Sequence, residues 1–246
     1  METLEDSTLW EGLAGTFFGK QENRFIMAGG SAFPGGKPWQ DGIKHFSDQV
    51  FVFEQLPDGS FSKVYQGNDL PVPLAEGSYA TLPGGLLCVG GLTPDGITGK
   101  SWLLAYSGSG ITVTEYPSLP VPVKNSTATV IGSKVYLVGG ELADGTSTDQ
   151  FLVLDLSNPT KGWEKLPNFP VPVSGATLTS QQDGEEVALF SFGGRARRTA
   201  GEATIFYASV YHFRPSLNRW TQKGDIQYDK DTSVSLAMAT ASAVGG

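Results

Sequence analysis

Short apolar segments that each end in a glycine doublet recur four times along this chain of 246 residues. The segments cover residues 25–30, 86–91, 135–140 and 189–194. A near-continuous run of large apolar side chains predicts a strand that is buried on both faces. Glycine lets the backbone turn where no Cβ fits, so we interpret the doublets as structural. Their recurrence every fifty to sixty residues, roughly, is typical of a fold that repeats one small sheet.

Three further strands are predicted around each apolar run. A strand of small residues precedes it, an aromatic and β-branched strand follows it after a polar loop, and Trp163 and Trp220 mark a last short strand. The small-residue strands are expected at 13–16, 77–81, 126–129 and 174–177, and the third strands at 49–53, 101–106, 151–154 and 209–213. No ten-residue window shows helical periodicity. The pattern therefore predicts an all-β chain made of four-stranded β-propeller blades, with the small-residue strands lining the central channel.

The repeat begins a fifth time near the end of the sequence. Residues 234–246 have the composition of another small-residue strand. We expect about four complete blades plus the first strand of a fifth, in a single domain over residues 1–246 that is incomplete at its C-terminal end. An open propeller would expose an apolar blade face and an unpaired strand edge. A closed four-bladed ring is the alternative, but it would leave the last strand without a sheet.

Composition and charge narrow the possible partners. The 32 glycines and 15 prolines suit a turn-rich chain, and a net charge of −8 argues against nucleic acid or an anionic membrane as partner. No apolar run approaches the roughly 20 residues that span a bilayer. The first residues lack the features of a signal peptide, which predicts a cytoplasmic protein if Met1 is the natural start, and a periplasmic or secreted one if a leader was removed. Two distant histidines and Cys88, which we interpret as a small core residue, do not predict a metal site.

The loops that follow the doublets are expected to share one rim of the channel and to hold the functional residues. The candidate binding residues there are Lys37, Trp39, His45, Arg195 and Arg197, and the candidate catalytic residue is Glu141. A guanidinium group binds a carboxylate bidentately, and a tryptophan ring can stack on a sugar. The structural alternatives are a solvated charge for Lys37, packing over Pro34 and Pro38 for Trp39, and a solvent-facing arginine cluster. Such a rim suits a small anionic or sugar ligand, or a protein partner.

Two segments carry a more specific resemblance. Residues 10–15 (Trp-Glu-Gly-Leu-Ala-Gly) and 28–39 (Ala-Gly-Gly-Ser-Ala-Phe-Pro-Gly-Gly-Lys-Pro-Trp), together with kelch-like doublets, resemble the cyclically permuted branch of the N-acetylneuraminate epimerase (sialic acid mutarotase) family. The resemblance implies a six-bladed kelch propeller and an isomerase without a cofactor, which interconverts the anomers of a small acidic sugar, N-acetylneuraminic acid. Anomerisation needs a base that removes the hydroxyl proton and an acid that protonates the ring oxygen.

The resemblance also implies a catalytic glutamate directly after one doublet and an arginine six positions later. Glu141 stands at that glutamate position in the third repeat, while Ser147 stands at the arginine position. The implied order of the blades puts the catalytic blade beyond Gly246, so this chain is expected to supply part of a sugar-binding rim. The alternative is a non-catalytic kelch module that binds a protein or glycan through the same rim.

Overall fold

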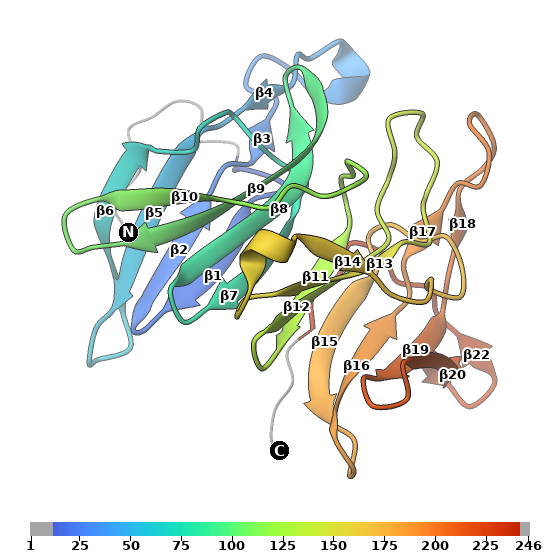
Figure 1. The fold of residues 1–246 in the computed structure, drawn as a ribbon. Coiled ribbons are helices and arrows are strands. Elements are labelled where there is room, and N and C mark those ends of the chain that lie inside the picture. Colours follow the sequence, from blue (N-terminus) through green and yellow to red (C-terminus); the bar gives the residue numbers. More distant parts are fainter. Residues whose placement is uncertain (1–11, 242–246) are drawn as a thin grey trace. The chain divides into compact units, whose positions relative to one another are not determined.

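The computed structural model describes residues 12–241, and nearly all regular structure in this range is β-strand. The strands form four antiparallel four-stranded sheets, named blades one to four in chain order, and three two-stranded ribbons (Figure 1). Two 3₁₀ turns, η2 (Pro38–Gln40) and η3 (Pro159–Lys161), are the remaining elements of the described range. No helix between residues 12 and 241 is long and apolar enough to cross a membrane. The predicted all-β class and the four-stranded repeat are confirmed.

The strands of each blade follow one another in sequence order across the sheet. Blade one is β1 (Phe17–Gln21), β2 (Arg24–Ala28), β5 (Gln49–Gln55) and β6 (Phe61–Asn68). Blade two is β7 (Ser78–Leu82), β8 (Gly85–Thr93), β9 (Gly96–Tyr106) and β10 (Ile111–Tyr116). Blade three is β11 (Thr127–Ile131), β12 (Lys134–Val138), β13 (Phe151–Asp155) and β14 (Trp163–Lys165). Blade four is β15 (Thr177–Gln182), β16 (Val187–Phe192), β19 (Ser209–Arg214) and β20 (Arg219–Asp225).

The three ribbons lie in the connections. They are β3 (Ser31–Ala32) with β4 (His45–Phe46), β17 (Arg195–Ala196) with β18 (Ile205–Phe206), and β21 (Gln227–Asp229) with β22 (Thr232–Ser233). The first two lie between the second and third strands of blades one and four. These connections follow the doublets, so the loops that the sequence marked as polar and variable contain paired backbone.

The chain divides into two compact units, each with its own core. Unit 1 is residues 1–116 with blades one and two, and unit 2 is residues 117–246 with blades three and four. In unit 1 the core packs Ile26 and Val52 of blade one with Leu86 and Cys88 of blade two. Cys88 is fully buried, and this burial raises the pKa of its thiol, so its predicted role as a core residue is confirmed. The prediction of a single domain stays a prediction.

The core of unit 2 is built mainly from aromatic side chains. Phe151 of blade three contacts Phe213 and Trp220 of blade four, with ring centroids 4.8 and 5.0 Å apart. Phe169, in the connection between the two blades, lies against the same tryptophan. These edge-to-face arrangements are the geometry that aromatic pairs prefer. The third and fourth strands of the repeat are therefore aromatic because they fill the space between neighbouring blades.

The first strand of each blade is entered through one residue with left-handed backbone. This residue is Gly15, Glu76, Asn125 or Gly175, with φ between 53° and 66°. Left-handed backbone interrupts strand pairing, so the strand begins only after it. The predicted small-residue strand at 13–16 is wrong for this reason, because β1 begins at Phe17. The segment 174–177 is wrong in the same way, since only its last residue belongs to β15.

The first glycine of a doublet lies where no Cβ fits. At Gly139, φ is 66° and an added Cβ would lie 2.1 Å from the carbonyl oxygen of Val173. Gly29 and Gly193 have the same left-handed backbone and the same kind of clash. The doublet of blade two differs, because β8 continues through Gly90 and Gly91 as far as Thr93, with a shift of register between Val89 and Gly91. The prediction that a doublet ends the second strand is therefore wrong for blade two.

The segment expected to begin a fifth blade contains no strand over its described residues 234–241. It instead repeats the entry loop of the other blades. The amide of Gly194 donates to the carbonyl of Leu236 at 2.6 Å, as Gly140 donates to Val173 at 2.8 Å. Met238 has φ 58° and donates its amide to the carbonyl of Gly175. Residues 242–246 lie outside the described range.

Candidate functional site

Each blade fixes the residue after its doublet with the same backbone pairing. Glu141 forms an isolated antiparallel bridge with Lys124, which directly precedes the left-handed residue of blade three. The equivalent bridges join Ser31 to Ala14, Leu92 to Ala75, and Arg195 to Ser174. The amides of Glu141 and Lys124 donate to each other's carbonyls at 2.7 and 3.1 Å. The repeat thus holds a pair of side chains at a defined place in every blade.

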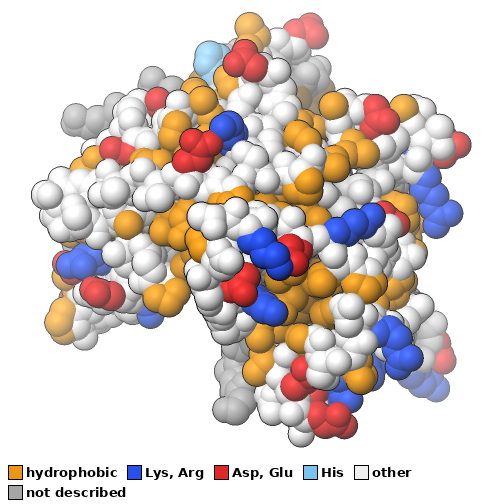
Figure 2. Space-filling model, viewed as in Figure 1, with side chains coloured by type: hydrophobic (Ala, Val, Ile, Leu, Met, Phe, Trp, Pro, Cys, Tyr) orange, Lys and Arg blue, Asp and Glu red, His pale blue; other side chains and the backbone are white. Residues whose placement is uncertain are grey.

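In blade three this pair is charged, and blade four adds a third charge. The Oε1 atom of Glu141 lies 3.3 Å from Nζ of Lys124, and its Oε2 atom lies 3.7 Å from Nη2 of Arg195. The side chains of Glu141 and Lys124 are each 20% exposed, and that of Arg195 is 34% exposed. Side chains of opposite charge also neighbour one another elsewhere over the face drawn in Figure 2. The three side chains therefore place one carboxylate beside two cationic groups at the position after the doublet.

The two predicted arginines take different positions. Arg195 opens β17 and contacts Glu141, Ala196 is fully buried, and Arg197 follows. The amide of Arg197 donates to Oγ of Ser147 at 3.3 Å, and the amide of Ser147 donates to the carbonyl of Arg197 at 2.8 Å. The structure therefore brings Arg195 to Glu141 and places Arg197 against the loop that begins at Glu141.

The predicted residues of unit 1 lie on the long connection between β3 and β4. Lys37 directly precedes η2, and its Nζ atom lies 5.9 Å from the centroid of the Trp39 ring. Trp39 is 78% exposed, so packing over Pro34 and Pro38 does not bury it. A tryptophan with a cation over one face has the form of a platform for a polar ring, but the contact with a ligand stays a prediction.

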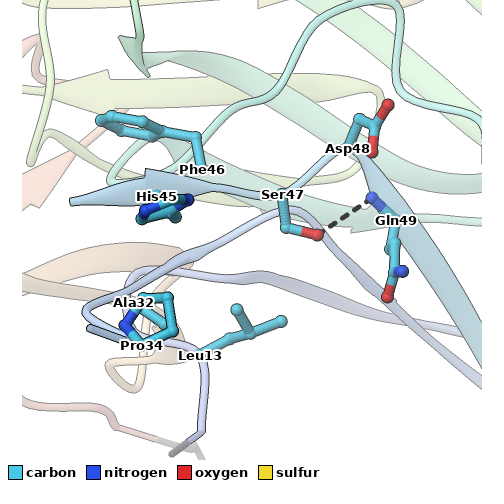
Figure 3. Close-up of a pocket in the computed structure, with 8 residues that line it drawn as sticks. All are labelled: Leu13, Ala32, Pro34, His45, Phe46, Ser47, Asp48 and Gln49. Carbon is cyan, nitrogen blue, oxygen red and sulfur yellow. Dashed lines mark hydrogen bonds between the residues drawn. The ribbon is translucent and has the colours of Figure 1, made fainter. Parts of the chain in front are cut away.

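His45 lies in β4 opposite Ala32 and lines a cavity of about 220 Å³. Figure 3 shows this cavity at the base of the connection, beside β4 and the start of β5. Its walls are Leu13, Ala32, Pro34, His45, Phe46, Ser47, Asp48 and Gln49. Oγ of Ser47 accepts a hydrogen bond from the amide of Gln49 at 3.1 Å. Lys37 and Trp39 are not among the lining residues, so the cavity does not join the three predicted residues of unit 1.

Sequence reasoning missed Lys124, although a signal for it exists. The equivalent position is Ala14, Ala75 and Ser174 in the other three blades, so an aligned repeat shows one charged residue among small ones. It also missed the ion pair of Lys44 with Glu76 in unit 1. This pair joins the end of the blade-one connection to the left-handed residue of blade two, and sequence spacing alone does not indicate it.

A second cluster of charges lies at the opposite end of blade four, in the turn between β15 and β16. Asp183 accepts hydrogen bonds from the amides of Glu185 and Glu186, from Nε of Arg214 at 2.6 Å, and shares one with Nε2 of buried His212 at 2.8 Å. These donors, the backbone amide of Glu185 foremost, hold the pKa of Asp183 well below its usual range. The cluster is saturated with internal partners, so we interpret it as structural. Among residues 12–241 no group of three His, Cys, Asp or Glu side chains is arranged to hold a metal ion.

Comparison with known proteins places this arrangement in a class. The fold is similar to that in the structure of YjhT, with a TM-score of 0.70 at 14% identity over 93% of this chain and 73% of that one. Together with the four blades, this likeness shows a kelch-type β-propeller fold. The family model for N-acetylneuraminate epimerase matches residues 116–242, more than half of the sequence. The chain belongs to the N-acetylneuraminate epimerase family.

Individual relatives match over part of their length. An N-acetylneuraminate epimerase of Brucella suis is 30% identical over 144 residues, which are 58% of this chain and 33% of the relative. An N-acetylneuraminate epimerase of Vibrio vulnificus is 40% identical over 108 residues, 44% of this chain and 26% of the relative. The matched part of the chain spans about a third or less of these curated relatives. The predicted family is confirmed, and the cyclic order of the blades stays a prediction.

Proposed function

We propose that this chain acts in a sialic acid mutarotase, which interconverts the α and β anomers of N-acetylneuraminate by acid/base-assisted ring opening. Membership of the epimerase family supports the reaction class. The observation that carries the proposal is the position of Glu141 between Lys124 and Arg195, at the backbone site that every blade fixes after its doublet. A carboxylate can accept a proton and an ammonium group can donate one, and in this site Oε1 of Glu141 lies 3.3 Å from Nζ of Lys124.

The reaction divides between these groups as follows. The carboxylate of Glu141 removes the proton of the anomeric hydroxyl, and Lys124 donates a proton to the ring oxygen. The bond between the anomeric carbon and the ring oxygen breaks, which gives the open-chain keto acid. Rotation about the bond between the carbonyl carbon and its neighbour in the carbon chain then exposes the other face of the carbonyl. The hydroxyl oxygen that came from the ring attacks this face, and both proton transfers reverse. Proton balance is kept because each group ends in its starting state.

The substrate carries a carboxylate on the anomeric carbon, and this group needs a cation to orient the carbon that reacts. The cationic side of the site, with Lys124 and Arg195 beside Glu141, suits an acidic sugar better than a neutral one. The same cations neutralise the negative charge that a second carboxylate brings near Glu141. No step in this scheme uses a cofactor.

Exchange spectroscopy by NMR on the two anomers of N-acetylneuraminate tests the proposal. The full chain is expected to accelerate exchange above the spontaneous rate, and Glu141→Gln is expected to lower the catalysed rate by about 10²-fold or more, the usual contribution of a positioned general base. Glu164→Gln, which removes an exposed carboxylate of unit 2, is the matched control and is expected to leave the rate unchanged. Exchange no faster than the spontaneous rate would exclude catalysis by this chain. Catalysis that survives Glu141→Gln would place the base at another residue of this chain.

A further inference from the structure

The cations near the blade-three loop are not equivalent. Lys124 and Arg195 both contact the carboxylate of Glu141. Arg197 has no ion pair among residues 12–241, and its Nε atom is buried without a hydrogen-bond partner in that range. A buried donor without a partner destabilises the folded chain, and a charged donor does so more strongly than a neutral one. The guanidinium of Arg197 therefore lacks the anion that Arg195 already has.

The backbone holds Arg197 firmly in this position. Its amide and carbonyl both pair with Ser147, so β17 of blade four is tied to the loop 141–147 of blade three. A methyl group added to Gly145 would lie 3.2 Å from Nη1 of Arg197, which shows that the guanidinium lies over the backbone of this loop. Arg197 directly follows the two-residue strand β17, in which Arg195 is partly exposed and Ala196 is fully buried.

From this geometry we infer that Arg197 binds the carboxylate of the ligand and determines the preference for an acidic sugar. Arg195 instead forms an ion pair with Glu141. A planar guanidinium offers its donors in a fork that matches a carboxylate. The side chain of Arg197 is partly exposed, so an arriving carboxylate can pair with its guanidinium without breaking the contact between Arg195 and Glu141. The identity of the ligand rests on the proposed function, but the anion site itself does not need catalysis to exist.

Binding measured separately from turnover tests this inference. Isothermal titration of the full chain with N-acetylneuraminate, and with the neutral sugar N-acetylmannosamine, gives affinity without reference to exchange. Arg197→Gln is expected to weaken binding of N-acetylneuraminate by about tenfold or more, the usual loss when a charge-assisted hydrogen bond is removed. Arg197→Lys is expected to restore part of the loss, because it returns the charge without the fork. The neutral sugar should bind equally to the wild type and both variants.

The neighbouring arginines provide controls. Arg198 is exposed, so Arg198→Gln is expected to change the affinity less than twofold. Arg195→Gln is expected to lower the exchange rate more than the affinity, because Arg195 contacts Glu141. Unchanged affinity in Arg197→Gln, with a circular dichroism spectrum and a urea midpoint like those of the wild type, would overturn the inference.

The outcomes separate the inference from the proposed function. A chain that binds N-acetylneuraminate through Arg197 but does not accelerate exchange supports the anion site and contradicts the mutarotase. A chain that accelerates exchange with equal affinity in wild type and Arg197→Gln supports the mutarotase and contradicts the anion site. No measurable binding of N-acetylneuraminate by the wild-type chain contradicts both.

Discussion

Blades one and two of unit 1 place Ser31 and Leu92 directly after their doublets, whereas blades three and four of unit 2 place Glu141 and Arg195 there. All four residues make the same antiparallel bridge to the entry loop of their own blade. The backbone of the repeat is thus constant at this position while the side-chain chemistry changes from neutral to charged.

The comparison shows how a repeat fold separates stability from chemistry. The bridge uses only backbone groups, so the side chain after the doublet is free to vary without loss of pairing. In unit 1 the residues directly after the doublets are neutral, and the predicted binding residues lie on the long connection of blade one. Unit 2 uses it for a carboxylate and a guanidinium held within 4 Å of each other.

The largest effect is expected from replacing the first glycine of a doublet, and this change should destabilise both units equally. Gly139→Ala forces a left-handed backbone on alanine and drives its Cβ toward the carbonyl of Val173, at 2.1 Å. The free energy of unfolding, measured by urea denaturation, is expected to fall by about 3 kcal/mol or more, or the chain fails to fold. Gly29→Ala in unit 1 should match it, because its Cβ would lie 2.2 Å from the carbonyl of Leu74.

Gly162→Ala separates the clash from the backbone strain. Gly162 also has a positive φ, of 80°, but no atom lies within 4 Å of an added Cβ. Its expected cost is about 1–3 kcal/mol, that of a backbone conformation (φ 80°, ψ −172°) essentially confined to glycine. Equal losses at Gly139 and Gly162 would show that close approach of the backbone is not what the doublet provides.

The next effect is expected on the rate of anomer exchange, and it should come from unit 2 alone. Glu141→Leu gives blade three the residue that blade two has at the equivalent position, Leu92. Exchange of N-acetylneuraminate anomers is expected to fall by about 10²-fold. The free energy of unfolding, measured with urea, is expected to change by less than about 1 kcal/mol, because partly exposed ion pairs contribute little to stability. A large loss of stability with this change would mean that the charged cluster holds blade three together, and the comparison between the units would then fail.

A smaller effect, dependent on pH, is expected at the other end of blade four. The hydrogen bonds to Asp183 lower the pKa of its carboxyl in the folded state, so the stabilisation is fully present above the ordinary carboxyl pKa of 3.8 and is lost as the pH falls through the lowered value. Asp183→Asn should therefore lower the urea midpoint at pH 7 and have much less effect near pH 2. The equivalent turn of blade two is Pro83–Gly84, which has no ionisable group. The same loss from Asp183→Asn at both pH values would show that its charge is not what stabilises the turn.

Sequence reasoning predicted the second and third strands of each blade because these must be apolar to fill the space between blades. Phe151 and Phe213 are examples, since each fills the core of unit 2. It failed at the first strands of blades one and four, where the predicted segments include the left-handed residues Gly15 and Gly175, because glycine also occurs in extended backbone and so does not by itself mark the turn. It predicted Glu141 and Arg195 from their place after a doublet. Their contact could not be predicted because it joins two different blades, and the contact of Lys124 depends on the bridge between the entry loop of blade three and the residue after its doublet.

The smallest effect tests whether the ion pairs of the two units differ in role. Lys44 and Glu76 in unit 1 are partly buried like Lys124 and Glu141 in unit 2, but they join a loop to a blade entry. A double-mutant cycle of Lys44→Met and Glu76→Gln, followed by urea unfolding, is expected to give a coupling energy of about 0.5 kcal/mol that weakens in 1 M salt. Anomer exchange should stay within about twofold of the wild type in both single variants, because a tether that lies outside the proton-transfer steps changes only the ordering of the loop. A fall in exchange comparable to that of Glu141→Leu would instead place a second acid/base pair in unit 1, and the chemistry would then no longer be confined to the unit whose doublets end in charged residues.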